Sequence, residues 1–144
     1  MVWLPLAATE APAPEVVAAK RSRTARVLLV DDDASVAEVC RRLIESLGHT
    51  CVAVATSAEA LERTSVELFD VIVCDYRLGT ETADSVVEGL EEIAPEMVAR
   101  TVIATGATTD AGVLELTERH GLRLVAKPYG LNALAEVIDA AMPA

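Results

Sequence analysis

Aromatic residues and long apolar runs are both scarce in this chain of 144 residues. Aromatic side chains make up 3% of the sequence, against 52% for hydrophobic residues overall, so any core must be built from Val, Leu, Ile and Ala. No apolar run reaches the ~18 residues of a membrane span. The start, Met1 to Leu6, is too short and too proline-rich for a signal peptide, and no basic region precedes it. We therefore expect one cytoplasmic domain with an aliphatic core.

Cysteines are few, and two common nucleotide-binding motifs are missing. The three cysteines, Cys40, Cys51 and Cys74, lack the spacing of metal ligands, and their odd number indicates reduced, mostly buried thiols. Cys74 is expected to be a small strand side chain that faces the core. The sequence has no GxGxxG after its first apolar run and no GxxxxGK[ST], which argues against a dinucleotide-binding or P-loop fold.

Positive charge is also in short supply. The chain has 12 Lys and Arg residues against 23 Asp and Glu residues, a net charge of −11. Such a surface has no electrostatic footprint for nucleic acid or for an anionic membrane, so direct contact with either is not expected. The short basic stretch from Lys20 to Arg26 follows an Ala-Pro-Ala-Pro stretch of linker composition. We expect residues 1–25 to be a linker or leader and residues 26–144 to be the folded domain.

Short β-branched runs alternate with helical patterns through the rest of the chain. Buried parallel strands have this composition, and apolar residues spaced by three and four indicate amphipathic helices. Strands are expected at about 26–31, 50–55, 70–74, 100–105 and 122–126, and helices at about 34–47, 56–64, 84–93, 109–121 and 131–141. Five such β-α units predict an α/β fold, a doubly wound (βα)5 three-layer sandwich.

Polar side chains follow four of the predicted strands where each strand ends. They are Asp31-Asp32-Asp33, Asp75, Thr105 and Lys127-Pro128. Ligands of an open parallel sheet bind beyond the carboxyl ends of its strands, so these groups are expected to converge on one crevice. Asp33 precedes a predicted helix and is expected to cap it.

The residue types in this crevice predict phosphoryl-transfer chemistry. Three carboxylates need compensating cations: Lys127 supplies one charge, and hard oxygen ligands favour Mg²⁺. A carboxylate can act as nucleophile and form an aspartyl phosphate. Asp75 stands alone at its strand end and is the best candidate nucleophile, while Asp31 and Asp32 suit the metal. Lys127 and Thr105 can contact the oxygens of the phosphoryl group.

Four sequence blocks resemble the signatures of the receiver domains of two-component response regulators. The blocks are Arg26 to Asp33 (RVLLVDDD), Val71 to Leu78 (VIVCDYRL), Val102 to Gly106 (VIATG) and Val125 to Pro128 (VAKP). The resemblance implies a flavodoxin-like sheet of order 2-1-3-4-5 and a phospho-acceptor module rather than an enzyme. It implies a partner that is a histidine kinase or a histidine phosphotransfer domain. The implied site has Mg²⁺ on Asp31, Asp32, Asp75 and the backbone carbonyl of Arg77, phosphate on Asp75, phosphoryl contacts from Thr105 and Lys127, and a cis peptide at Pro128.

Two features depart from that family. The stretch from Arg77 to Asp84 lacks the usual proline, so a looser loop is expected there. The switch position, three residues before the lysine, usually holds an aromatic residue that moves with Thr105. Here it is Leu124, which favours a modest response to phosphorylation.

The leader resembles part of another signalling protein. Val2 to Ala7 looks like the last strand of a histidine-kinase ATPase domain, which favours the C-terminal receiver of a hybrid sensor kinase over a stand-alone regulator.

Two other functions compete with the phospho-acceptor. A haloacid-dehalogenase-type phosphatase would use Asp31 as nucleophile in Asp31-x-Asp33-x-Ser35, but it would leave Asp75 without a role. A pseudo-receiver that only binds a partner is disfavoured by the intact acid set. A weak homodimer is left open.

Overall fold

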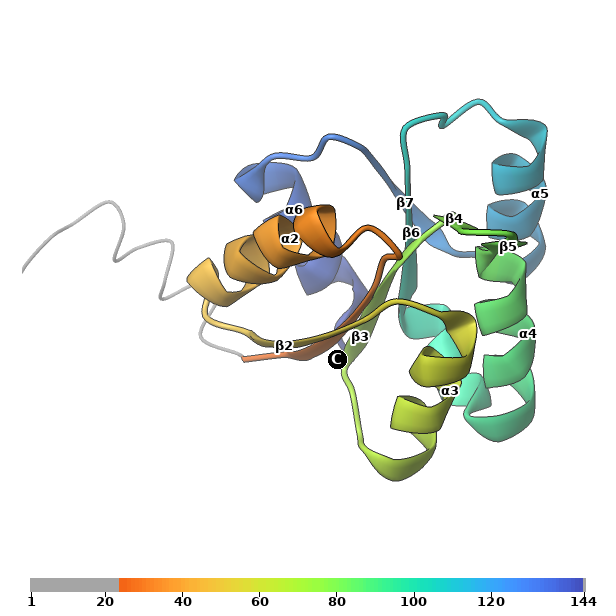
Figure 1. The fold of residues 1–144 in the computed structure, drawn as a ribbon, viewed down its shortest axis with the longest axis horizontal. Helices are drawn as coiled ribbons and strands as arrows, with labels where there is room; N and C mark the ends of the chain where they lie inside the picture. Colours follow the sequence, from red (N-terminus) through yellow and green to blue (C-terminus); the bar gives the residue numbers. More distant parts are fainter. Residues whose placement is uncertain (1–23, 144) are drawn as a thin grey trace, which may run out of the picture.

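A five-stranded parallel sheet forms the centre of the computed structural model, which describes residues 24–143 (Figure 1). The strand order is β2-β1-β3-β6-β7. The strands are β1 (Arg26–Val30), β2 (Thr50–Val54), β3 (Val71–Asp75), β6 (Thr101–Thr105) and β7 (Arg123–Ala126). In units of one strand and one helix, this is the predicted order 2-1-3-4-5, so the flavodoxin-like prediction is confirmed.

Helices cover both faces of the sheet. One face carries α2 (Ala34–Ser46) and α6 (Leu131–Ala141), and the other carries α3 (Ser57–Val66), α4 (Ala83–Ile93) and α5 (Ala111–His120) (Figure 1). Alternate residues of each strand feed the two aliphatic clusters: Leu28 packs under α3, α4 and α5, and Leu29 packs under α2 and α6. Both side chains are almost fully buried. The sandwich therefore has the predicted three layers.

The helix ends follow from local side-chain chemistry. The Asp33 carboxylate accepts hydrogen bonds from the backbone N–H groups of Ser35 and Val36, so Asp33 is the N-cap of α2, as predicted. Asp110 caps α5 in the same way, and Gly121 ends that helix in the left-handed conformation at φ 65°. The two N-caps lie in the loops that follow β1 and β6, at the carboxyl edge of the sheet.

The loop after β3 differs from the sequence-based expectation. The stretch without proline is not a loose loop but a two-stranded antiparallel hairpin, β4 (Arg77–Leu78) and β5 (Glu81–Thr82). Gly79 in its turn has a φ of 67°, which glycine adopts without steric cost. A 3-10 helix η1 (Pro95–Arg100) also follows α4, where only a helix stop at the proline was expected. Both are short local structures that hydrophobic periodicity does not report.

The proposed leader lies almost wholly outside the described residues. Val2 to Ala7, which resemble a kinase strand in sequence, lie outside the described residues. Within residues 24–143, none of the helices combines the length and the hydropathy that a membrane crossing requires.

Candidate functional site

Three carboxylates meet at the carboxyl edge of the sheet. Asp31 and Asp32 follow β1, and Asp75 is the last residue of β3, the strand that pairs with β1 through Val30 and Cys74. One carboxylate oxygen from each acid lies within 4.8 Å of the others. Asp31 is buried, Asp75 is partly buried and Asp32 is exposed. The structure therefore brings together the three acids that the sequence pattern predicted for one pocket.

Asp31 is held in place through both of its oxygens. Its Oδ1 accepts a hydrogen bond of 2.9 Å from the backbone N–H of Asp33, and its Oδ2 accepts one of 3.3 Å from the Lys127 ammonium group. Its own N–H donates to the carbonyl of Val54 on β2. Because the side chain is bonded to a helix cap and a lysine and the backbone is bonded to β2, Asp31 is a fixed point of the pocket.

Lys127 joins the two ends of this acid cluster. Its Nζ lies 3.3 Å from Asp31 Oδ2 and 3.4 Å from Asp75 Oδ2. Burial opposes the charge, but the carboxylates of Asp75 and Asp31 outweigh it and raise the pKa of the Lys127 ammonium group. The lysine is therefore a permanent cation at neutral pH. Its backbone N–H also donates to the carbonyl of Thr105, which fixes the end of β7 against β6.

Asp75 carries a charge that the protein only partly compensates. Burial raises the pKa of its carboxyl group, Lys127 opposes that effect, and the nearby Asp31 adds to it. Three carboxylates with one lysine leave an excess of two negative charges if all the acids are ionised. Hard oxygen ligands with that excess charge suit Mg²⁺, which takes one or two carboxylates and keeps several waters. The acid set fits this ion, and Asp31, Asp32 and Asp75 are the side chains that could hold it.

Thr105 and the hairpin border the pocket. Thr105 ends β6 between the strands of Asp75 and Lys127, is buried, and accepts a hydrogen bond at Oγ1 from the backbone N–H of Ala107. Within residues 24–143 its hydroxyl donates no hydrogen bond, so the proton is available for a ligand. Across the pocket, a Cβ at Gly79 in the hairpin turn would lie 3.9 Å from Asp32 Oδ2, so the turn packs beside that acid.

Arg77 reaches away from the acids. Its guanidinium group lies 3.6 Å from Asp110 Oδ2 and 5.8 Å from the centroid of the Tyr76 ring. The side chain thus links the hairpin to the cap of α5, and the role of its backbone carbonyl as a metal ligand stays a prediction. The peptide between Lys127 and Pro128 is cis, in agreement with the resemblance. Leu124 is half-buried on β7 and packs against the cluster under α3, α4 and α5.

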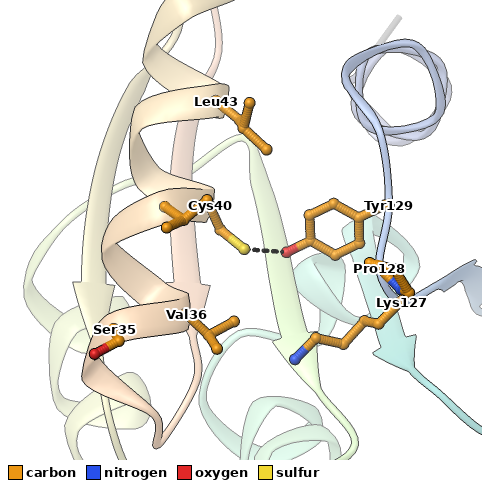
Figure 2. Close-up of a pocket in the computed structure, with 8 residues that line it drawn as sticks. Ser35, Val36, Cys40, Leu43, Lys127, Pro128 and Tyr129 are labelled. Carbon is orange, nitrogen blue, oxygen red and sulfur yellow. Dashed lines mark hydrogen bonds between the residues drawn. The ribbon is translucent and has the colours of Figure 1, made fainter.

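A groove beside Lys127 was missed by the sequence analysis. It has a volume of about 500 Å³ and separates α2 from the β7–α6 loop, residues 127–130. Figure 2 shows Tyr129 reaching across it to Cys40, and its hydroxyl donates a hydrogen bond of 2.7 Å to the thiol sulfur. The sequence assigned Cys40 to the core and gave Tyr129 no role. The only signal in the sequence was Tyr129 itself, an aromatic residue with a polar hydroxyl directly after the Lys-Pro pair. The lining residues are Ser35, Val36, Val39, Cys40, Leu43, Lys127, Pro128 and Tyr129.

A parallel sheet with acids and a lysine at the carboxyl ends of its strands defines a flavodoxin-like α/β domain with its site at that edge. Residues 27–139 match the model of the response regulator receiver domain, so the chain belongs to the receiver family of two-component signalling. Receiver domains are signalling modules that accept a phosphoryl group on an aspartate.

Individual relatives resemble this chain only at low sequence identity. The transcriptional regulatory protein GlrR of Escherichia coli (strain K12) is 26% identical over 120 residues, which are 83% of this chain and 27% of that protein. The chain thus spans about a quarter of the length of such curated relatives. Among solved structures, the beryllofluoride-activated NtrC4 receiver domain dimer has a TM-score of 0.71 at 23% identity and covers 81% of this chain and 95% of its own.

A second structural neighbour is a receiver domain of a sensor histidine kinase from Pseudomonas aeruginosa PAO1. It was solved with a magnesium ion in its active-site cleft, and it has a TM-score of 0.72 at 21% identity over 82% of this chain and 97% of that chain. At such identities, both structural likenesses report the shared fold.

The phosphatase alternative finds no support in this geometry. It needs Asp33 as a second acid of the site, but the Asp33 carboxylate is bonded to two backbone N–H groups of α2. It also needs a pair of acids after the lysine, for which the chain offers Glu136 and Asp139 in the last helix, and Glu136 is exposed. It also assigns no role to Asp75, which lies within the acid cluster.

Proposed function

We propose that this domain is a Mg²⁺-dependent phospho-acceptor that takes a phosphoryl group from a phosphohistidine onto Asp75. The observation that carries the proposal is the placement of Lys127 between Asp31 and Asp75, with Asp32 in the same cluster. The donor would be a histidine kinase or a histidine phosphotransfer domain.

The transfer needs one bond made and one broken. An oxygen of the Asp75 carboxylate attacks the phosphorus, a P–O bond forms, and the P–N bond to the donor histidine breaks with its electron pair returning to the imidazole. The product is an acyl phosphate on Asp75 and a free histidine on the donor. The transition state of this transfer is stabilised by groups that neutralise the charge on the phosphoryl oxygens.

Each surrounding residue has one task in this proposal. Lys127 supplies a positive charge beside the acceptor, and the Thr105 hydroxyl donates to a phosphoryl oxygen. Asp31, Asp32, Asp75 and the carbonyl of Arg77 hold Mg²⁺, which supplies Lewis-acid stabilisation of the transferring group. Asp31 serves as a metal ligand rather than as the nucleophile in this proposal, and the Asp33 N–H and Lys127 hold its two oxygens in place.

Labelling by a small phosphodonor tests the proposal directly. Acetyl phosphate with Mg²⁺ should add one phosphoryl group to the protein, and reduction of the acyl phosphate followed by peptide mapping should place it on Asp75. Asp75→Asn should abolish labelling while the fold survives, and Asp31→Asn should weaken Mg²⁺ binding and slow the labelling. A label on Asp31, with Asp75 dispensable, would falsify the assignment in favour of a phosphatase.

The wider protein is a separate part of the proposal. Because Val2 to Ala7 resembles the end of a kinase ATPase domain, we favour the C-terminal receiver of a cytoplasmic hybrid sensor kinase. The curated relatives favour a regulator instead, since they are transcriptional regulatory proteins. The coding sequence upstream of Met1 decides between them: a histidine-kinase core there supports the hybrid, and its absence supports the regulator. In both cases we expect no direct contact of this acidic domain with nucleic acid or membrane.

A further inference from the structure

The hydrogen bond between Tyr129 and Cys40 spans the groove beside the lysine. The Tyr129 hydroxyl lies 2.7 Å from the Cys40 sulfur, and Figure 2 shows the two side chains meeting from opposite walls. Burial raises the pKa of both groups, so both are neutral and the phenol O–H is the donor. Among residues 24–143, this is the one hydrogen bond that the Tyr129 side chain makes.

Lys127 depends on the loop that Tyr129 anchors. Its Nζ lies at nearly equal distances, 3.3 and 3.4 Å, from Asp31 and Asp75. A lysine side chain is a flexible four-carbon stem, so the placement of its backbone helps to set where Nζ rests between the two acids. The start of the loop is fixed by the bond from the Lys127 N–H to the Thr105 carbonyl. At its other end, the N-cap Gly130 has no side chain that caps α6. Tyr129 is therefore the side chain that ties the middle of the loop to α2.

Helix α2 is itself tied to the acid cluster. Asp33 caps its first turn and also donates its backbone N–H to Asp31 Oδ1. The contacts thus form a closed ring. Asp31 is bonded to Asp33, which caps α2, and Cys40 on α2 is bonded across the groove to Tyr129. Tyr129 is two residues from Lys127, which is bonded to Asp31. Without the bond from Tyr129 to Cys40, the backbone bond from Lys127 to Thr105 still holds the start of the loop, but no side-chain hydrogen bond ties the middle of the loop to α2.

We propose that Tyr129 is a positioning residue for phosphoryl transfer, whose hydroxyl, held by Cys40, fixes the β7–α6 loop and with it the bridging position of Lys127. The inference rests on the proposed function for its consequence in catalysis, but its structural part concerns the lysine alone. Small displacements of a group that stabilises a transition state cost large factors in rate, about 100-fold per ångström in unfavourable cases. A ring that merely filled the groove would act through its area and would not need the hydroxyl.

The chain offers an unusually clean probe of the lysine. Lys20 and Lys127 are its only lysines, so a protein labelled with ¹³Cε-lysine gives two side-chain signals, and Lys20→Arg assigns them. Tyr129→Phe removes the hydroxyl and keeps the ring. Cys40→Ala removes the acceptor, and Cys40→Ser restores an acceptor at the same place. Cys51→Ala is the matched control, because Cys51 packs against the same apolar cluster from β2.

We expect Tyr129→Phe and Cys40→Ala to shift and broaden the Lys127 signal in the Mg²⁺-free protein. Both should also slow labelling by acetyl phosphate about tenfold at saturating Mg²⁺ and donor. Cys40→Ser and Cys51→Ala should keep the Lys127 signal and stay within about twofold of the parent rate. Circular dichroism and thermal melts establish that each variant is folded before it is compared.

An unchanged Lys127 signal in folded Tyr129→Phe overturns the inference, whatever happens to the rate. A changed signal with an unchanged rate also overturns it, because the hydroxyl would then position the lysine without consequence for the transfer. Failure of the parent protein to be labelled at Asp75 refutes the proposed function instead. The two failures are distinguishable, since the lysine signal is read without any phosphodonor.

Discussion

Lys127 at the end of β7 reaches across β6 to place its ammonium group 3.4 Å from the carboxylate of Asp75 at the end of β3. The contact has opposite effects on its two members. It helps to keep the lysine charged, but it does not cancel the burial that raises the pKa of Asp75. The ionised Asp75 is thus a source of instability in the metal-free protein, which is the usual cost of a carboxylate gathered with others for binding and catalysis.

Magnesium should stabilise the fold through this excess charge. Thermal melts of the parent protein should move to higher temperature with millimolar Mg²⁺, because the free energy of unfolding rises by about 2.7 kcal/mol at a concentration 100 times the dissociation constant. Asp75→Asn should raise the melting temperature without Mg²⁺, because it removes the poorly compensated charge, and should respond much less to the ion. Equal responses of parent and variant would remove Asp75 from the metal site. Calcium, which prefers more ligands at longer distances, is a useful comparison ion.

The same charge predicts a pH dependence of the Mg²⁺-free protein. A carboxyl group with a raised folded pKa favours the protonated folded state, so its contribution is present below the ordinary value of 3.8 and is lost as pH rises through the folded pKa. The stability gain of Asp75→Asn over the parent should therefore grow as pH rises from 3.8 and then level off. Urea unfolding at a series of pH values measures this difference. A gain that is constant over the series would show that Asp75 titrates at the same pH in both states.

Much of the fold and the acid site could be predicted from the sequence, because both depend on repeated or clustered residue types. Buried strands such as Val71–Asp75 stand out through β-branched residues, and parallel strands bring their ends to one edge. That rule alone placed Asp31, Asp75 and Lys127 together. The helix cap at Asp33 followed from its position between a strand and an apolar period, and the structure confirms it.

The remainder depends on contacts that have no pattern in sequence. The hairpin after β3 has two residues in each strand and a turn through Gly79, too short for any periodicity to report. The bond from Tyr129 to Cys40 joins a loop to a helix whose relative placement exists only in the folded domain. A half-buried tyrosine after Lys-Pro could equally have pointed its hydroxyl to solvent.

Leu124 predicts a muted response of the α5–β7–α6 face to phosphorylation. The leucine is half-buried against the apolar cluster and has no polar group with which to follow a movement of Thr105. Hydrogen exchange with and without the phosphate mimic beryllofluoride should therefore show strong protection at the acid pocket and only small changes in α5, β7 and α6. Leu124→Tyr should enlarge the changes on that face. Strong, ordered protection across all three elements of the parent protein would contradict this expectation.

Two neighbouring acids should separate folding from metal binding. The Asp33 carboxylate accepts two hydrogen bonds from the backbone of α2. Asp33→Ala should therefore lower the free energy of unfolding by about 1 kcal/mol through loss of the cap. The Mg²⁺ affinity of this variant and its labelling at Asp75 should remain close to those of the parent, and Asp33→Ser should recover most of the stability.

Asp32→Ala should have the opposite profile, because Asp32 is exposed and belongs to the acid cluster. Its stability without metal should change little, but its Mg²⁺ binding should be weaker and its labelling slower. Urea unfolding and Mg²⁺ titration of the same three variants give both quantities. Loss of labelling in folded Asp33→Ala would reopen the phosphatase alternative, since that mechanism requires Asp33 as its second acid.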